Sequence, residues 1–87
     1  MLKQLEHRRS DIEVIADILR QGEGCKTEIM YHVGLRYGQL LKYISRLLEL
    51  RLVHEEKTVQ YPKYTVTQKG QKLLREIDIV LMLLKGK

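Results

Sequence analysis

The chain has 87 residues, of which 44% are hydrophobic and 31% are charged, and this composition favours one folded domain over a disordered segment. Its longest apolar run, residues 79–84, is far short of the roughly 20 residues that a membrane-spanning helix needs. The formal net charge of +5 favours an anionic partner, and the absence of Phe and Trp predicts an aliphatic core. A single cysteine excludes an intramolecular disulfide and suits a reducing cytoplasm.

Charges are distributed unevenly along the chain. Residues 11–28 carry five acids and two bases, whereas residues 57–75 carry five bases and no acid. Residues 36–46 add three bases and no acid. This asymmetry indicates a basic binding face and an acidic back. We expect residues 1–9 to be a basic N-terminal arm and not a signal peptide, because no apolar run follows their basic residues.

The first helix is predicted to begin at Asp11, because Ser10 and Glu13 match the S-x-x-E capping box. Two apolar stripes predict that this helix is sandwiched between two neighbours. The first stripe contains Ile12, Ile15, Ala16 and Leu19, and the second contains Val14 and Ile18. Residues 21–24 then indicate a helix stop and a loop.

Two further helices are predicted over residues 26–33 and 37–50, separated by Gly34. Such a pair with a tight turn is typical of a helix-turn-helix. Cys25 is expected to be a small residue at the start of the first of them, and Tyr31 and Tyr37 are expected to be packing residues near the turn. The predicted buried positions are Ile29, Met30 and Val33 on the first helix, and Tyr37, Leu40, Leu41, Ile44, Leu47 and Leu48 on the second.

A hairpin and a final helix complete the chain. Strands are predicted over residues 52–57 and 64–67, with a loop of about six residues that contains Pro62. Thr67 can cap a last helix that runs from Gln68 to about Lys85. The order of elements predicts an α+β fold that is mostly helical.

The outer half of the 37–50 helix carries side chains that suit a DNA groove. Arg and Lys donate to guanine O6 and N7, and Gln pairs with adenine. Any amphipathic helix has a polar outer face, but a merely solvated face usually mixes both signs of charge. No acid occurs here before Glu49, so we expect DNA recognition, with the N-terminal residues Gln39 and Lys42 deepest in the groove. The expected contacts are Arg36, Gln39, Lys42, Tyr43 and Arg46.

Several segments occur in an order known from one family. They are Lys26-Thr27-Glu28-Ile29-Met30-Tyr31, Leu35, Tyr37, Tyr43-Ile44, Leu50-Arg51-Leu52-Val53 and Tyr64-Thr65-Val66-Thr67-Gln68-Lys69-Gly70. In this order they resemble the archaeal winged-helix DNA-binding proteins that include a small chromatin-associated dimeric protein of Sulfolobus. The resemblance covers residues 10–84. It implies a winged helix-turn-helix of three helices, a β-hairpin wing and a long C-terminal helix. It also implies that the long C-terminal helix forms a dimer and that the protein binds DNA.

The resemblance also places the wing at residues 57–63. Basic wing residues of such proteins contact the minor groove or flanking phosphates, and the candidates here are Lys57 and Lys63, with Gln60 and Tyr61 at the tip. Glu55 and Glu56 precede the wing and would repel phosphate. Strand alternation sends at most one of them to a given face, so this objection is partial.

The last helix is predicted to join two copies of the chain. Its stripe consists of Leu73, Ile77, Val80 and Leu84, widened by Leu74 and Leu81, and Ile79, Met82 and Leu83 add apolar groups on the other faces. One small domain cannot cover a helix that is apolar all round, so a C2 homodimer is expected, although this helix can also pack on the first one. The expected units are the arm (1–9), the winged helix-turn-helix domain (10–67) and the C-terminal dimerisation helix (68–87).

No catalytic or metal-binding pattern stands out. Cys25, His7, His32 and His54 lack the C-x-x-C or H-x-x-x-H spacing of zinc sites, and no phosphate loop or nucleophile elbow is present. We therefore predict no catalysis, metal, cofactor or small-molecule ligand. The expected function is binding of double-stranded DNA by a cytoplasmic, nucleoid-associated homodimer that is a transcription regulator or a chromatin protein. The rivals are a protein-interaction module with an acidic partner and, ranked lowest, RNA binding, because no aromatic stacking platform is apparent.

Overall fold

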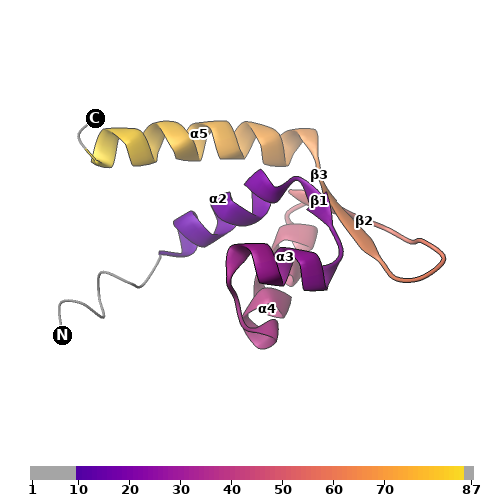
Figure 1. Ribbon diagram of the computed structural model, residues 1–87. Coiled ribbons are helices and arrows are strands. Elements are labelled where there is room, and N and C mark those ends of the chain that lie inside the picture. Colours follow the sequence, from indigo (N-terminus) through magenta and orange to yellow (C-terminus); the bar gives the residue numbers. More distant parts are fainter. Residues whose placement is uncertain (1–9, 86–87) are drawn as a thin grey trace.

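The computed structural model describes residues 10–85 and is shown in Figure 1. These residues form four helices and a three-stranded antiparallel sheet, which confirms the mostly helical α+β fold class. The expected arm, residues 1–9, lies outside the described residues. The elements are α2 (Asp11–Gln21), β1 (Glu23–Gly24), α3 (Lys26–Val33), α4 (Tyr37–Glu49), β2 (Val53–Glu56), β3 (Lys63–Val66) and α5 (Gln68–Leu84).

The helix ends follow the predicted signals. The backbone N–H of Glu13 donates to Ser10 Oγ over 3.2 Å, and the Ser10 N–H donates to the Glu13 carboxylate over 3.0 Å, which completes the capping box. Gly34 ends α3 in the left-handed conformation, with φ of 80°. Thr67 Oγ1 accepts from the Gly70 N–H over 3.1 Å and caps α5.

The sheet contains a strand that the sequence did not predict. Residues 21–24 were expected to be a helix stop and a loop, but β1 pairs with β3, and the strand order is β1-β3-β2. A strand of two residues is too short to show an alternating pattern. The hairpin strands were predicted correctly in kind, and each differs by one residue at its ends, at 53–56 and 63–66.

The core lies where α2 is sandwiched between α5 and the helix-turn-helix, as its two apolar stripes predicted (Figure 1). Sheet residues from β2 and β3 close this core on one side. Its buried members are Val14, Ile18, Leu19, Ile29, Val33, Leu40, Ile44, Leu47, Leu52, Val53 and Tyr64.

Four side chains that were predicted to be packed inside are exposed instead. Tyr31 is 83% exposed, because Ile29 and Val33 face the core and Tyr31 projects from the other side of α3. Tyr37 and Leu41 lie one turn apart on one flank of α4, beside the buried face rather than in it. Ile12 lies on the same side of α2 as Leu19, but two turns earlier, and is half-exposed.

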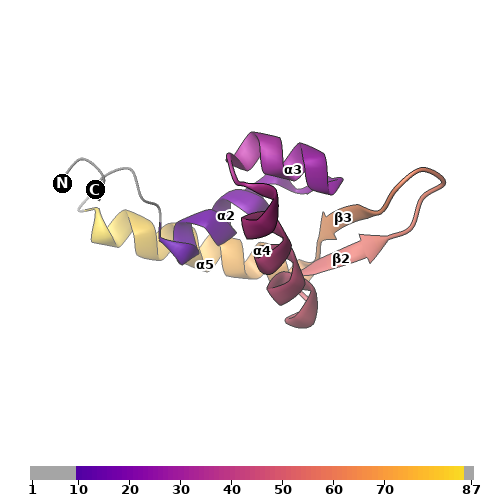
Figure 2. The same ribbon diagram turned by 90° about the horizontal axis from the view of Figure 1, so that it is seen from below.

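The molecule is elongated, with extents of 44 × 29 × 19 Å. The β2–β3 hairpin and the C-terminal end of α5 project at opposite ends, as Figures 1 and 2 both show. Within residues 10–85 no helix is long and apolar enough to cross a membrane.

Candidate nucleic-acid interface

The N-terminal turn of α4 is held by one of its own predicted DNA-binding residues. Arg36 is the N-cap, and its backbone N–H donates to Gln39 Oε1 over 3.1 Å. This bond closes the first turn, but it occupies the Gln39 carbonyl. Pairing with adenine uses both groups of the amide, so the cap bond restricts the orientations in which Gln39 could read an adenine through the second lone pair of its carbonyl.

Lys42 and Arg46 lie one turn apart on the exposed side of α4, as predicted. Neither side chain forms an ion pair or a hydrogen bond with any residue between 10 and 85. They line a shallow hollow of about 520 Å³ between α4 and the start of α2, together with Gln39, Tyr43 and Asp11. The outer side of α4 therefore presents two cations whose charge is available to an anion.

Tyr43 lies differently from its neighbours on α4. Its ring is half-buried against the hydrophobic core, and its hydroxyl donates to Asp11 Oδ1 over 2.7 Å. The phenol thus attaches α4 to α2. A contact between Tyr43 and DNA stays a prediction, and it would compete with this bond.

The wing is a turn with internal hydrogen bonds. The Tyr61 N–H donates to Thr58 Oγ1 over 3.2 Å, and the Thr58 hydroxyl donates in turn to the Tyr61 carbonyl. Lys57 and Gln60, both predicted contacts, are exposed on either side of Val59, whose side chain is fully exposed. The tip therefore presents polar, basic and apolar groups on an ordered loop.

Lys63, the third predicted wing contact, already has an acidic partner. Its Nζ lies 3.5 Å from Glu23 Oε2, because strand β1 places Glu23 beside β3. An exposed pair of this kind contributes only about 0–1 kcal/mol, so phosphate can compete for the lysine. The sequence could not indicate the pair, since it depends on the unpredicted strand.

Glu55 and Glu56 are both exposed at the base of the wing. Glu55 is paired with Tyr64 across the sheet, and Glu56 is paired with Lys63. Successive residues of a strand point to opposite faces, so the two carboxylates lie on different sides of the hairpin, as expected. The repulsion of phosphate is accordingly divided between two faces.

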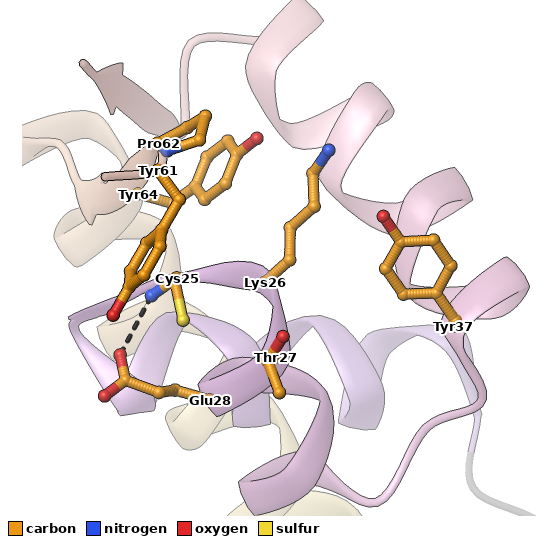
Figure 3. A pocket seen from close by; sticks show the side chains of 8 residues that line it. All are labelled: Cys25, Lys26, Thr27, Glu28, Tyr37, Tyr61, Pro62 and Tyr64. Atoms are coloured by element: carbon orange, nitrogen blue, oxygen red, sulfur yellow. Dashed lines mark hydrogen bonds between the residues drawn. The ribbon is translucent and has the colours of Figure 1, made fainter. Parts of the chain in front are cut away.

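A second hollow, of about 510 Å³, lies between the wing and the starts of α3 and α4 (Figure 3). Lys26 stands between Tyr37 and the wing residues, and its Nζ is 5.9 Å from the centre of the Tyr64 ring. Thr27 and Tyr61 add hydroxyl groups to the same hollow. Lys26, Thr27 and Tyr37 were not among the predicted DNA contacts. The available signal was the position of Lys26 and Thr27 at the start of the first helix of the helix-turn-helix, which crosses the DNA backbone in such proteins.

The hydrogen bonds at the start of α3 lower the pKa of one carboxyl group in this second hollow. Glu28 Oε1 accepts from the Cys25 backbone N–H over 3.0 Å, and Cys25 is the N-cap of α3, in keeping with its expected place. The hydrogen bonds from the Cys25 backbone, and next from its side chain, hold the pKa of Glu28 below its usual value. No group of three His, Cys, Asp or Glu residues within 10–85 is arranged to hold a metal ion.

Helix α5 divides into two halves. The predicted interface residues Leu73 and Leu74 pack partly against the domain's own core, and Ile77 is only 8% exposed within a single chain. Leu81 is half-buried, whereas Val80 and Leu84 are exposed. The full set of exposed apolar side chains in the second half is Ile79, Val80, Met82, Leu83 and Leu84.

An ion pair fixes the middle of α5 to α2. The Arg20 guanidinium donates to Asp17 over 3.2 Å and also contacts the carboxylate of Asp78. This contact lies at a hollow between α2 and α5 that Arg20 and Asp78 help to line. The first half of α5 is therefore part of the domain, whereas the second half lines this hollow beside α2 with Leu81 and Met82 but leaves most of its apolar side chains exposed.

Comparisons with known proteins agree with this architecture. An uncharacterized protein of Methanocaldococcus jannaschii is 31% identical over 84 residues, which covers 93% of this chain and 82% of that protein. The crystal structure of Sso10a-2, a DNA-binding protein from Sulfolobus solfataricus, superposes with a TM-score of 0.83 at 24% identity, over 88% of this chain and 83% of that one. Sco5413, a MarR family transcriptional regulator from Streptomyces coelicolor, gives a TM-score of 0.71 at 18% identity, over 85% of this chain and 54% of that one. The family model for the winged helix-turn-helix matches residues 8–85, and the chain belongs to that family.

Proposed function

We propose that the protein binds double-stranded DNA as a homodimer, with α4 in the major groove and the wing on the flanking backbone. The observation that carries this proposal is the pair of exposed cations on α4, Lys42 and Arg46, which have no partner among residues 10–85, while the helix itself carries a single acid, Glu49, at its last position. A cationic helix face of this kind supplies phosphate and guanine contacts. Two similar proteins point the same way, since one is described as DNA-binding and the other as a transcriptional regulator.

The proposed contacts fall into two groups. Arg36, Gln39, Lys42 and Arg46 contact bases or phosphates from α4, and Lys57, Gln60 and Lys63 contact the backbone from the wing. Tyr43 is proposed to support DNA binding indirectly, because its hydrogen bond to Asp11 holds α4 in place. Such a protein is a transcription regulator or a chromatin protein, depending on its sequence preference.

The proposed dimer uses the second half of α5. Five exposed apolar side chains on one short stretch form a surface that a second copy covers symmetrically. Helix α5 has 17 residues and is therefore about 26 Å long at about 1.5 Å per residue. Recognition helices of two-fold dimers meet successive major grooves about 34 Å apart, and a seam built on α5 has that scale.

The experiment is a fluorescence anisotropy titration of a random-sequence duplex at several salt concentrations. Each phosphate contact contributes about −0.9 to the slope of log affinity against log salt, so a steep slope is expected. A slope near zero, or no binding at low salt, would overturn the proposal.

The rival interaction with an acidic partner rests on Glu55 and Glu56, which weaken the wing as a phosphate-binding surface. A competition experiment separates the two. Polyglutamate matched in charge to the duplex should displace the labelled duplex poorly if DNA is the ligand. Displacement at equal charge concentration would favour the acidic protein partner.

A further inference from the structure

The first turn of α5 holds the C-terminal end of the recognition helix at three successive carbonyl groups. Lys69 Nζ donates to the Leu50 carbonyl over 2.9 Å. The Thr67 hydroxyl donates to the Arg51 carbonyl over 2.7 Å, and the Thr67 N–H donates to the Leu52 carbonyl over 3.1 Å. We call these contacts the α4–α5 clamp.

The backbone at the clamp permits little variation. Arg51 adopts a left-handed conformation, with φ of 63°, as the residue after the C-cap of α4, where the Leu52 N–H donates to the Leu47 carbonyl over 2.8 Å and the Arg51 N–H donates to the Leu48 carbonyl over 3.0 Å. A Cβ atom at Gly70 would lie 2.2 Å from the Leu52 carbonyl oxygen, so α5 and the turn after α4 are in backbone contact. The orientation of α4 is thus tied to the first turn of α5.

We infer that Lys69 is a positioning residue for DNA recognition, which sets the orientation of α4 relative to α5. The inference rests on the proposed function, because the second half of the same helix carries the proposed dimer surface. Leu50 is the C-cap of α4, where carbonyl groups lack helical partners and a cation is favoured. Lys69 belongs to the basic stretch that the sequence assigned to a binding face, but its ammonium serves as a helix cap instead.

Lys69 is the clamp residue whose removal is simplest to interpret. Thr67 also caps α5 and Gly70 is sterically required, so their substitution would damage the fold. Lys69→Met keeps the aliphatic stem and removes the donor, and Lys69→Arg restores a cationic donor. Lys72→Met is the matched control, because Lys72 is exposed on the next turn of α5 and has no partner among residues 10–85.

The measurement is the distance between spin labels on the two helices, by pulsed electron paramagnetic resonance on the full chain. The labels replace the exposed residues Ser45 and Glu76, in a Cys25→Ser background that keeps a small polar residue at the N-cap of α3. An excess of unlabelled protein suppresses distances between two chains. Lys69→Met should widen or shift the distance distribution, whereas Lys69→Arg and Lys72→Met should leave it as in the parent.

Unlabelled variants are then titrated with the random duplex. Lys69→Met should lose about threefold or more in affinity relative to Lys72→Met, and Lys69→Arg should recover that loss. An unchanged distance distribution in Lys69→Met overturns the inference. The inference is also overturned if the distribution changes in Lys69→Met but this variant binds the duplex as tightly as Lys72→Met does. If the parent binds no duplex, the proposed function itself fails and the inference fails with it. Lys69→Gln, which is too short to reach Leu50, replaces Lys69→Met if the latter melts early.

Discussion

The hydroxyl of Tyr43 on α4 donates a hydrogen bond to Asp11 at the start of α2, over 2.7 Å. The two residues are 32 positions apart in sequence, and their contact joins the predicted DNA-binding helix to the first helix of the domain. Because the Tyr43 ring is also half-buried, removal of this side chain should lower the stability of the domain more than it lowers DNA affinity directly.

Tyr43→Phe should lower the free energy of unfolding by about 1 kcal/mol and leave duplex affinity nearly unchanged, because the variant loses one hydrogen bond and keeps the ring. Urea denaturation and anisotropy measure the two effects. Tyr31→Phe is the control, since Tyr31 is exposed and has no hydrogen bond among the described residues. A large loss of affinity at parental stability would assign Tyr43 to the DNA contact that its helical position predicted.

Lys42→Ala and Arg46→Ala should each weaken duplex binding without unfolding the domain, because both side chains are exposed and have no partner among the described residues. A base contact should cost about 1–3 kcal/mol, and a phosphate contact should reduce the salt slope by about 1. Lys85→Ala, which removes one positive charge at the C-cap of α5 and leaves α4 and the wing unchanged, controls for net charge. Parental affinity in both variants, with native circular dichroism, would remove α4 from the interface.

Gly70→Ala should cost about 3 kcal/mol or prevent folding, because the new methyl group would meet the Leu52 carbonyl and cannot be accommodated. Gly38→Ala is the opposite case. Apart from adjacent residues and the backbone of its own helix, no described atom lies within 4 Å of a Cβ at Gly38, and alanine in a helix should add roughly 0.5–1 kcal/mol of stability. Thermal melts compare the two variants. If Gly38→Ala is more stable but binds the duplex less well, Gly38 allows the backbone to approach DNA closely. A loss of stability in Gly38→Ala would contradict the helix at this position.

The predicted fold came from signals that depend on a few neighbouring residues. Ser10 with Glu13, Gly34 and Thr67 mark helix ends through local hydrogen bonds, and a local sequence pattern is enough to find them. Strand β1 depends instead on a distant partner, Thr65 opposite Glu23, and its two residues have no pattern of their own.

The predicted site was less complete for the same reason. The pairing of Lys63 with Glu23, the use of Lys69 as a helix cap and the exposure of Tyr37 all arise from tertiary contacts. Charge counts along the chain treat every lysine alike, so they could not separate Lys69 from Lys42, which has no partner within residues 10–85.

The stability of the domain should depend on the ionisation of Glu28. Its pKa is held below the usual 4.5, first by the hydrogen bond from the Cys25 backbone, so folding is favoured while the carboxylate is charged. That contribution is present above pH 4.5 and is lost as the pH falls through the lower folded-state value. Denaturation of the parent and of Glu28→Gln should therefore give free energies that converge in acid. A difference that stays constant with pH would contradict this, and Glu55→Gln is the control.

Self-association should depend on the end of α5 rather than on its middle. Ile77 belongs to the predicted stripe, but it is buried within one chain, so its substitution would damage the domain itself. Leu83 and Leu84 are 71% and 77% exposed, and a double change to Glu leaves the core of each chain untouched. If a second copy covers these residues, the new charges would be buried in an apolar seam without partners. Burying an unpartnered polar group costs about 2–7 kcal/mol, and burying an unpartnered charge costs more.

We therefore expect Leu83→Glu with Leu84→Glu to sediment as a folded monomer, to bind duplex much more weakly and to show a lower salt slope, because each monomer contacts one groove. Gln71→Glu, an exposed change in the first half of α5, should remain a dimer. Sedimentation velocity and circular dichroism test both variants. If the unmodified protein is already a monomer at high micromolar concentration, the apolar end of α5 does not join two copies. Binding to DNA would then proceed through one recognition helix at a time.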